Sequence, residues 1–582
     1  MYANFTCDAL KRSSLASKLY SVNDQRVANE QDFDSATGEL FKNSSSVLLL
    51  DAGYTAKITD WMSGTDASKL SPEFKLVDIE TRHVSRKPPA PFITSTLQQE
   101  ASRKLGLSPS RTMSIAQSLY EEGFITYMRT DSPQLSSTAF SIAQDIVDRT
   151  FGAAYLESSA TGKHQGKSAK RGKMDERSAR APANAQEAHE AIRPSETAGL
   201  FKSPEDTFLS GPARALYALI YKRTLASVMA SSKSQTNTYV IEGTKSVDSE
   251  IKRVVFRASN TEVLFKGFLA AMEMEDDRVR ATESNGLRQV NSGQILRLST
   301  EVASVRSDSD GADNDGVVDL SPLEGETINT RHPGIQGVKH TTRPPSRYSE
   351  ASFIKELESI GVGRPSTYSK ILQILKEREY IIVDKQTIIP TVKGLVVTKM
   401  LENHFPELVE AEFTAYMEKC LDLIAQGSQD RVSFLREFYF GEEDDNSAPR
   451  GLLLKANHKV QEMELDHKES RVLKFPPIED LGLIKLGSND IYLERESEEA
   501  DKPLRWVLPA EMQEDIRLID RESIQRILLT EADTSGYQKG TDPASGKPVS
   551  IKSGRCDLHF IRVFVMVCSQ VWEVYSDWRG CR

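Results

Sequence analysis

The chain has 582 residues, 38% of them hydrophobic and 27% charged, which is typical of a globular protein with several domains. No apolar run reaches the ~18 residues needed to cross a bilayer, and the N-terminus lacks the apolar centre of a secretory signal. The five cysteines form no C-x-x-C pair, which argues against a zinc ribbon and against a disulfide framework. We therefore expect an intracellular protein without membrane or zinc.

The formal net charge is −10, but the charge is unevenly distributed. Residues 163–180 are strongly basic, whereas 301–326 is strongly acidic. Net charge reports the average field, whereas a polyanion responds to local stripes of Lys and Arg. Solvated loops are the simpler interpretation of both runs, so charge neither identifies nor excludes a nucleic-acid partner.

The first eighty or so residues mix short apolar runs with Ser, Gly and Asp, which predicts strands and turns. A stiff extended segment at 87–91 then precedes two predicted helices, at 94–104 and 112–122, with apolar residues at 3–4 spacing. Gly123 ends the second helix, and the β-branched and aromatic residues 124–128 predict a short strand. A helix, a glycine stop and a short strand would present side chains at a cleft.

The rest of the chain alternates between helical, strand-like and loop-like composition. Two surface loops are predicted, a flexible insertion at 155–185 and the acidic tract around 301–330. The other predicted elements are a helix at 212–229, strands at 238–242, 253–258 and 294–298, helices at 349–360 and 367–379, more helices to about 465, a strand at 549–552 and an irregular tail.

Tyr127 and Arg129 lie two residues apart in the predicted strand, so their side chains share one face because strand side chains alternate. The planar fork of an arginine binds phosphate, and a phenol is able to attack phosphorus. Hydrogen-bonding groups around the pair are added by Thr126, Thr130, Asp131 and Ser132. From spacing alone, a surface strand with a half-buried tyrosine and a solvated arginine is the simpler interpretation.

A second candidate site is the pair formed by His189 and Arg193. If the segment 186–194 is helical, these residues lie four apart on one face and would grip one phosphate from two sides. An ordinary polar helix end explains the same spacing.

A third candidate is the glycine-rich turn at 361–365, which leads into a predicted helix. Backbone N–H groups at a helix N-terminus and small hydroxyls, here those of Ser366 and Thr367, favour a phosphate. Arg364 lies in the same turn. Plain turn chemistry is the alternative interpretation.

Four segments together resemble the type IA DNA topoisomerases, and they occur in that family's order. They are PPAPFITSTLQQE at 88–100, GFITYMRTDS at 123–132, EAHEAIRP at 187–194 and GVGRPSTY at 361–368. The letters TYMRTDS and GRPSTY are similar to bacterial DNA topoisomerase I rather than to the topoisomerase III branch. The resemblance covers about 70–440 and, more weakly, 470–555, where it suggests the family's C-terminal repeats.

The resemblance implies single-strand DNA cleavage, strand passage and religation, which together relax negative supercoils without ATP. It implies that Tyr127 is the nucleophile, which takes the 5′ phosphate and frees a 3′ hydroxyl. Arg129 and His189 would neutralise the phosphate charge as the phenolate attacks. The residues expected to bind DNA around this site and along the DNA path are Gln117, Glu121, Thr126, Thr130, Asp131, Arg193, Arg364, Ser366 and Thr367.

The family's metal-binding Toprim domain would precede the residues present here, so we expect this chain to lack it. Mg²⁺ is expected for the family, but its ligands are expected outside this chain, in a separate or missing Toprim segment. The pair Asp308 and Asp310 lies in the acidic tract and is interpreted as solvated loop. A non-catalytic single-stranded DNA-binding remnant of the same fold is the alternative function, and a scaffold unrelated to DNA is a third.

The fold implied by the resemblance is an α+β multidomain arch without the Toprim domain. We expect a helical lobe bearing Tyr127 at 88–231 and a helical base at 346–465, with β-rich arch segments at 1–87 and 232–345. A truncated C-terminal repeat region with an irregular tail would occupy 466–582. The expected partner is DNA, both as a single-stranded segment and as a passing strand, in the bacterial cytoplasm or in an organelle or nucleus.

Overall fold

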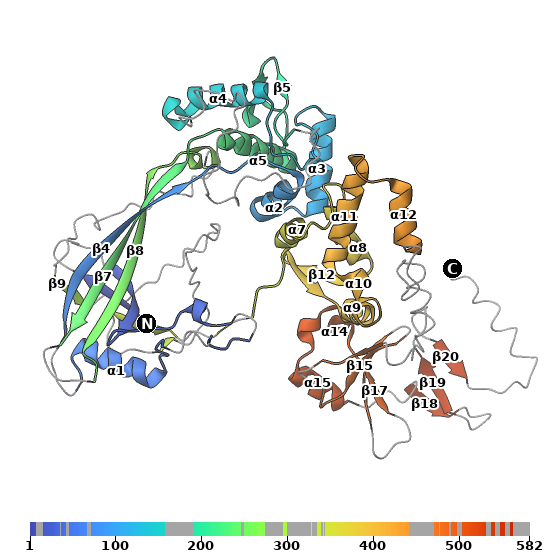
Figure 1. Ribbon diagram of the computed structural model, residues 1–582. Helices are drawn as coiled ribbons and strands as arrows, with labels where there is room; N and C mark the ends of the chain where they lie inside the picture. The colour runs from blue at the N-terminus through green and yellow to red at the C-terminus, as the bar shows by residue number, and fades with distance from the viewer. Residues whose placement is uncertain are drawn as a thin grey trace, which may run out of the picture. The chain divides into compact units, whose positions relative to one another are not determined.

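The computed structural model divides the chain into two compact units (Figure 1). One unit contains residues 1–107 and 111–346, and the other contains 347–582 together with 108–110. The structure describes residues 1–6, 15–34, 37–41, 46–66, 71–156, 190–245, 250–273, 295–298, 327–328, 334–338, 342, 344–441, 471–475, 478–487, 490–496, 503–530, 537–541, 548–552 and 559–562.

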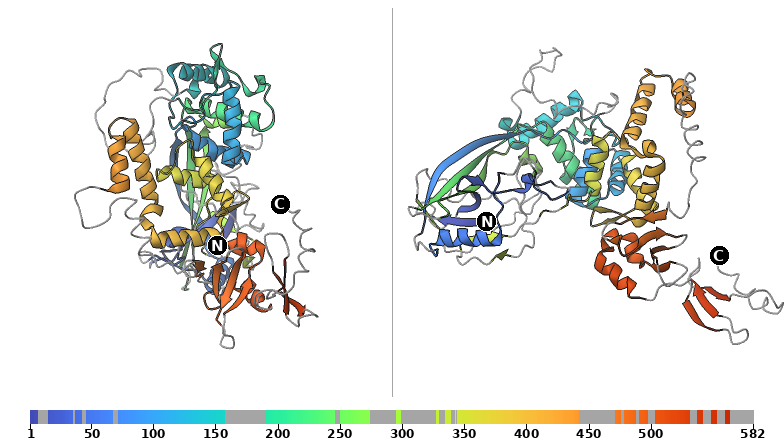
Figure 2. Two further views of the ribbon diagram at one scale, coloured as in Figure 1. Left: turned by 90° about the vertical axis from the view of Figure 1, so that its right-hand side faces the viewer. Right: turned by 60° about the horizontal axis from the view of Figure 1, so that its bottom comes forward.

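A nine-stranded sheet in the first unit has the order β10-β11-β1-β9-β4-β7-β8-β2-β3. Both predicted β-rich segments, 1–87 and 232–345, contribute strands to it. The antiparallel strands β4, β7 and β8 lie side by side as a long ribbon in every view (Figures 1 and 2). The strands are β1 Tyr2–Thr6, β2 Leu15–Val22, β3 Gln25–Arg26, β4 Glu73–Arg86, β7 Ser232–Thr244, β8 Arg253–Phe265, β9 Ile295–Leu298, β10 Thr327–Ile328 and β11 Ile335–Val338.

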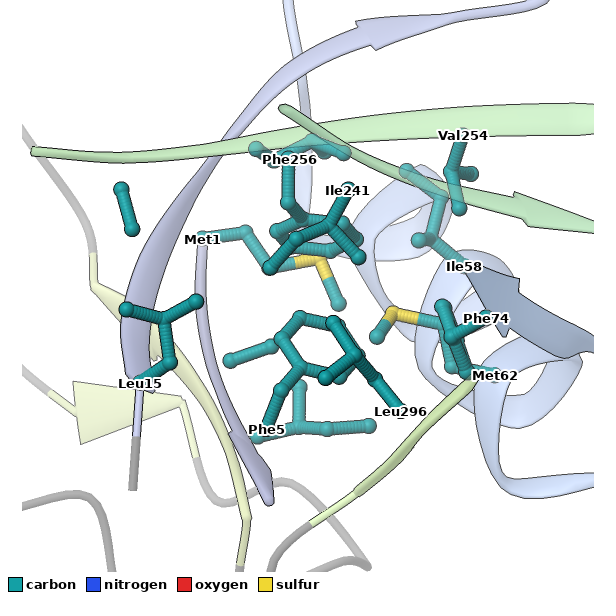
Figure 3. Packing of buried hydrophobic residues seen from close by; sticks show 14 of the residues in the cluster. Met1, Phe5, Leu15, Ile58, Met62, Phe74, Ile241, Val254, Phe256 and Leu296 are labelled. Atoms are coloured by element: carbon teal, nitrogen blue, oxygen red, sulfur yellow. The ribbon is translucent and has the colours of Figure 1, made fainter. Parts of the chain in front are cut away.

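One face of this sheet packs on helix α1, Ala52–Ser63, around buried Phe5, Phe74 and Phe256 (Figure 3). The Phe5 and Phe74 rings are 4.9 Å apart. The prediction of only strands and turns in the first eighty residues is wrong at α1. Its signals are short-range, since the Asp51 carboxylate accepts the N–H of the third helical residue and the buried apolar residues recur at helical spacing.

The helical part of the first unit begins with α2, Thr94–Leu105, and α3, Pro109–Glu121, which confirms the helices predicted at 94–104 and 112–122. Their apolar faces form one core with α5. A second core joins α4, α5 and α6. Because α5 leads into β7, and α6 follows β8, this second core anchors the end of the long ribbon. The remaining elements are α4 Ser137–Phe151, β5 Glu196–Thr197, β6 Leu200–Phe201, α5 Gly211–Ser227, α6 Leu269–Met272 and the 3-10 helices Glu30–Asp32, Ala153–Tyr155 and Pro204–Asp206.

The second unit combines helices with a two-stranded, a four-stranded and a three-stranded sheet. The four-stranded sheet shares one core with β13, α9 and α15. Strand β19 confirms the strand predicted at 549–552. The elements are α7 Glu350–Ser359, α8 Tyr368–Glu377, β12 Ile381–Asp384, β13 Thr387–Pro390, α9 Val392–His404, α10 Pro406–Val409, α11 Ala411–Ala425, α12 Arg431–Phe440, β14 Val472–Leu473, β15 Leu483–Leu486, β16 Ile491–Arg495, β17 Leu504–Val507, α14 Ala510–Glu514, the 3-10 helix Ile516–Leu518, α15 Arg521–Leu528, β18 Tyr537–Thr541, β19 Pro548–Lys552 and β20 His559–Arg562. Among the helices described here, none combines the length and the apolar character needed to span a bilayer.

Candidate active site

The segment that carries Tyr127 begins where helix α3 ends. Gly123 has φ +77°, a left-handed conformation that favours glycine, and its N–H donates to the carbonyl of Tyr120 over 2.9 Å. The strand predicted at 124–128 is wrong, because only Ile125 forms a β-bridge, to Pro194. Backbone groups in this segment bond instead to the chain at 191–195 and to the start of α2. The segment is therefore irregular but firmly attached.

Two threonines hold the backbone on either side of Tyr127. The Thr126 N–H donates to the carbonyl of Arg193 over 2.9 Å, and its hydroxyl donates to the carbonyl of Ala191 over 2.7 Å. The same hydroxyl accepts the N–H of Arg193 at 3.0 Å. On the other side, the Thr130 N–H donates to the Thr94 hydroxyl over 2.9 Å. Both predicted site threonines thus bond to other parts of the protein.

Tyr127 and Arg129 are exposed on the same side of this segment, while the residue between them is buried. The two side chains line one open cavity of about 480 Å³ together with Met113, Ser114 and Gln117 of α3. The residue Tyr127 is 37% exposed. Among the described residues, no carboxylate forms an ion pair with Arg129. The phenol of Tyr127 and the guanidinium of Arg129 therefore lie at the same cavity.

Helix α3 forms the polar and aromatic wall beside the phenol. The Gln117 side-chain amide donates to the Glu121 carboxylate over 2.6 Å. The Tyr120 ring contacts the Tyr127 ring edge to face, with centroids 5.3 Å apart. Sequence reasoning included Gln117 and Glu121 but missed Met113, Ser114 and Tyr120. The available signal was helical spacing, since residues three or four apart on α3 share a face with Gln117.

The chain at 190–194 runs beside the Tyr127 segment. The segment 186–194 is not helical from 190 onward, because Ile192 forms a bridge to Phe92 and Pro194 forms one to Ile125. In a helix the backbone N–H and C=O groups of this segment would bond to one another. Here they bond instead to the neighbouring segments that contain Phe92 and Ile125. His189, the other predicted phosphate-binding residue, lies outside the described residues.

Arg193 is 7% exposed, and its guanidinium bonds to groups inside the protein. It donates to one Glu190 oxygen from Nε (3.0 Å) and from Nη2 (2.6 Å), and from Nη1 to the carbonyl of Pro194 over 2.9 Å. Glu196 lies 3.3 Å from Nη2. Burial acts to raise the pKa of the Glu190 carboxyl, but hydrogen bonding from Ser136 and the charge of Arg193 outweigh it and lower that pKa. Arg193 therefore braces the segment, and a DNA contact from its side chain is not supported.

The turn around Arg364 belongs to the second unit. Gly361 and Gly363 have φ of +76° and +87°. Arg364 donates from Nη2 to Asp422 over 2.7 Å and lies 3.7 Å from Glu418, so its guanidinium is paired. The Thr367 hydroxyl accepts the N–H of Arg364 at 2.8 Å just before α8. Ser366, between them, is exposed.

The described residues do not fit a metal site. No group of three or more His, Cys, Asp or Glu side chains among them is placed to hold an ion. Asp131 is half-buried beyond Arg129, and the acidic pair Asp308 and Asp310 lies outside the described residues. We therefore assign no chemical step of this chain to a metal.

Comparison with known proteins places the chain in a family. The family model described as DNA topoisomerase matches residues 57–436. The chain is 34% identical to DNA topoisomerase 1 of Synechococcus elongatus over 540 residues, which covers 92% of this chain and 52% of that protein. It is 35% identical to DNA topoisomerase 1 of Streptomyces coelicolor over 557 residues, which covers 94% and 52%. The chain thus spans about half the length of the curated relatives it matches.

A solved structure agrees with the sequence comparison. Full-length topoisomerase I of Thermotoga maritima matches with a TM-score of 0.53 and 25% sequence identity, covering 86% of this chain and 65% of that one. The match confirms the predicted α+β multidomain fold. The matched residues 57–436 contain Tyr127, the segments that bond to the backbone around it, and the turn around Arg364. The chain therefore belongs to the type IA DNA topoisomerases of the bacterial topoisomerase I class.

Proposed function

We propose that this chain cleaves single-stranded DNA through Tyr127, passes a strand through the break and reseals it, relaxing negative supercoils. The observation that carries the proposal is the exposure of Tyr127 and Arg129 on one cavity, where the arginine has no ion-pair partner among the described residues. A phosphodiester that enters this cavity would meet a nucleophile and a cation together. The proposal places the protein on intracellular DNA.

The chemistry conserves the energy of the phosphodiester bond. The phenolic oxygen of Tyr127 forms a bond to phosphorus, the bond from phosphorus to the 3′ oxygen breaks, and the phenolic proton is lost as the 3′ oxygen gains one. The product is a 5′-phosphotyrosine and a free 3′ hydroxyl. Because the reverse attack by that hydroxyl restores both partners, religation needs neither ATP nor an oxidant. Mg²⁺ belongs to the family's chemistry, so the assay includes it.

The other residues divide into those that face DNA and those that hold the site. In this proposal Arg129 and His189 neutralise the phosphate, while Gln117 and Glu121 contact DNA from α3. Asp131 and the exposed Ser366 remain proposed DNA contacts. The residues whose described bonds favour a holding role are Thr126, Thr130, Arg193, Arg364 and Thr367.

The proposal also gives each region of the chain a task. Residues 88–231 would be the lobe that carries the nucleophile and separates during strand passage. Residues 1–87 and 232–345 would support it, and 346–465 would form the base. Residues 466–582 would correspond to a truncated C-terminal repeat region with an irregular tail.

Trapping the covalent intermediate tests the proposal. The chain is incubated with single-stranded oligonucleotides labelled at the 5′ or the 3′ end, with Mg²⁺ or with EDTA, and denatured. We expect the 3′-labelled fragment, which carries the 5′ phosphate, to remain attached to the protein. Tyr127→Phe should abolish the adduct, whereas Tyr439→Phe, which changes an exposed tyrosine of α12, should not.

Other outcomes select among the alternative functions. Oligonucleotide binding without any adduct would contradict autonomous cleavage and favour a non-catalytic DNA-binding protein of the same fold. Neither binding nor an adduct would favour a scaffold unrelated to DNA. An adduct that persists in Tyr127→Phe would assign the nucleophile to another residue.

A further inference from the structure

Thr94 is the first residue of α2 and is completely buried, yet its hydroxyl bonds to the segment that carries Tyr127. The hydroxyl lies 2.7 Å from the carbonyl of Met128 and 3.0 Å from that of Thr130. It also accepts the N–H of Thr130 at 2.9 Å. The Thr94 N–H donates to the carbonyl of Thr130 over 2.9 Å. Thr94 thus contacts both residues that flank Arg129.

The hydrogen bonds of the Thr94 hydroxyl do not cap its own helix, because the N-cap residue of α2 is Ile93. Here the partners lie 34 and 36 residues farther along the chain. Helix α2 is itself immobilised, because Leu97 and Ala101 are completely buried in the lobe core. Thr94 therefore connects a rigid helix to the irregular segment that carries the nucleophile.

The two tethers act at opposite sides of Tyr127. Thr126 fixes the backbone before the tyrosine to the chain at 191–193, and Thr94 fixes the backbone after it. These two anchors fix the course of the backbone on either side of Tyr127. The backbone in turn sets the directions in which the side chains of Tyr127 and Arg129 point. Attack on phosphorus demands close alignment, and a misplacement of about 1 Å costs on the order of 100-fold in rate.

We propose that Thr94 is a positioning residue, whose hydroxyl aligns Tyr127 and Arg129 for attack on the DNA phosphate. This inference rests on the proposed function. Valine has the shape of threonine but lacks the hydroxyl, so Thr94→Val would leave the carbonyl of Met128 and the N–H of Thr130 without this partner. A buried polar group without a partner is energetically unfavourable, so we expect the segment to shift toward an arrangement that satisfies both groups.

Single-turnover cleavage at saturating oligonucleotide tests the role. We expect Thr94→Val to slow adduct formation by about 10- to 100-fold while the oligonucleotide Kd stays within about twofold. Thr94→Ser restores the hydroxyl and should recover most of the rate. Thr224→Val is the matched control, because Thr224 is equally buried in the same lobe but donates only within its own helix, to Ile220. It should cleave at the wild-type rate.

Hydrogen exchange separates this inference from the proposed function. Thr94→Val should speed exchange of the Thr130 amide by about tenfold, whether or not the protein cleaves DNA, and Thr94→Ser should not. If the wild-type protein forms no adduct, the proposal that this chain cleaves DNA fails. The exchange rate of the Thr130 amide then shows by itself whether the Thr94 hydroxyl holds the segment. Should Thr94→Val not fold, Thr94→Ala, which also lacks the hydroxyl, replaces it.

Four results would overturn the inference. The first is cleavage by Thr94→Val at the wild-type rate, and the second is an unchanged exchange rate of the Thr130 amide. The third is an equal loss of cleavage and of melting temperature in Thr94→Val and Thr224→Val, which indicates general stability. The fourth is a weaker Kd with an unchanged cleavage rate, which indicates a contact to DNA rather than alignment.

Discussion

Two arginines from two family motifs have opposite environments. Arg129, in the first unit, is exposed on the cavity beside Tyr127, and no carboxylate among the described residues pairs with it. Arg364, in the second unit, lies between Asp422 and Glu418. Both residues stand in equally distinctive sequence motifs, so the motif alone does not indicate which guanidinium is available to a phosphate. The carboxylates supplied by the surrounding fold decide it.

Arg193 shows that closeness to Tyr127 does not decide whether a guanidinium is available to a phosphate either. Its backbone bonds directly to Thr126, next to Tyr127, yet its side chain is buried against Glu190. A buried arginine that bonds to two carboxylates and a carbonyl has a structural role, because moving its side chain to DNA would leave those groups without their partner. The following predictions test the difference between Arg129, which is exposed on the cavity, and the arginines Arg193 and Arg364, which pair with carboxylates.

The largest effect is expected at Arg129. Because it is the exposed cation beside the phenol, Arg129→Ala should slow adduct formation by about 100- to 1,000-fold, the loss typical of removing one group that stabilises developing charge. Its melting temperature should not change. Arg129→Lys keeps the charge without the fork and should be intermediate. Single-turnover trapping measures all three proteins, and equal rates would remove Arg129 from the site.

Arg364 is expected to affect stability instead. Arg364→Ala leaves Asp422 and Glu418 without their cation, and we expect the free energy of unfolding to fall by about 2–3 kcal/mol. Arg378→Ala, at an exposed arginine of the same unit without an ion pair among the described residues, should stay within about 0.5 kcal/mol. Urea unfolding measures both. Weaker oligonucleotide binding at unchanged stability would make Arg364 a DNA contact.

Substitution of Gly123 distinguishes the effect of backbone strain on stability from the effect of site geometry on cleavage. A Cβ at this position meets no atom within 4 Å, so Gly123→Ala should cost only the left-handed backbone penalty of about 1 kcal/mol. Gly199→Ala is the matched control, with φ +76° and equally open space. Both should lose similar stability in thermal unfolding. Only Gly123→Ala should slow cleavage, and equal cleavage by both would show that the turn does not aim Tyr127.

The smallest effect is expected from pH at Glu190. Its pKa is lower in the folded protein, so its ionised form stabilises the fold above its unfolded pKa, and that stability is lost as the pH falls through the lower folded value. Between pH 7 and about 5 this carboxylate should add no pH dependence. Glu190→Gln should therefore flatten the loss of stability below about pH 4.5. An unchanged acid limb of the unfolding curve would contradict the brace.

The local features of the site followed from sequence. Helical spacing predicted α2 and α3 within a few residues, and the glycine stop at Gly123 is confirmed by its positive φ. The order of the four motifs predicted the family, which the comparisons confirm. Helix α1 was missed although its cap and its periodic apolar residues are equally local. These features depend on neighbours within a few residues, so a single sequence contains the information.

Tertiary structure alone decided how the polar residues are used. The β-branched and aromatic composition predicted a strand at 124–128, but the backbone partners of that segment come from 191–195 and from Thr94, more than thirty residues away. Asp422 lies 58 residues from the arginine it binds. Sequence by itself predicted which residues carry the chemistry. The fold determined which of them are buried or paired, because burial and pairing depend on groups that meet only when distant segments pack together.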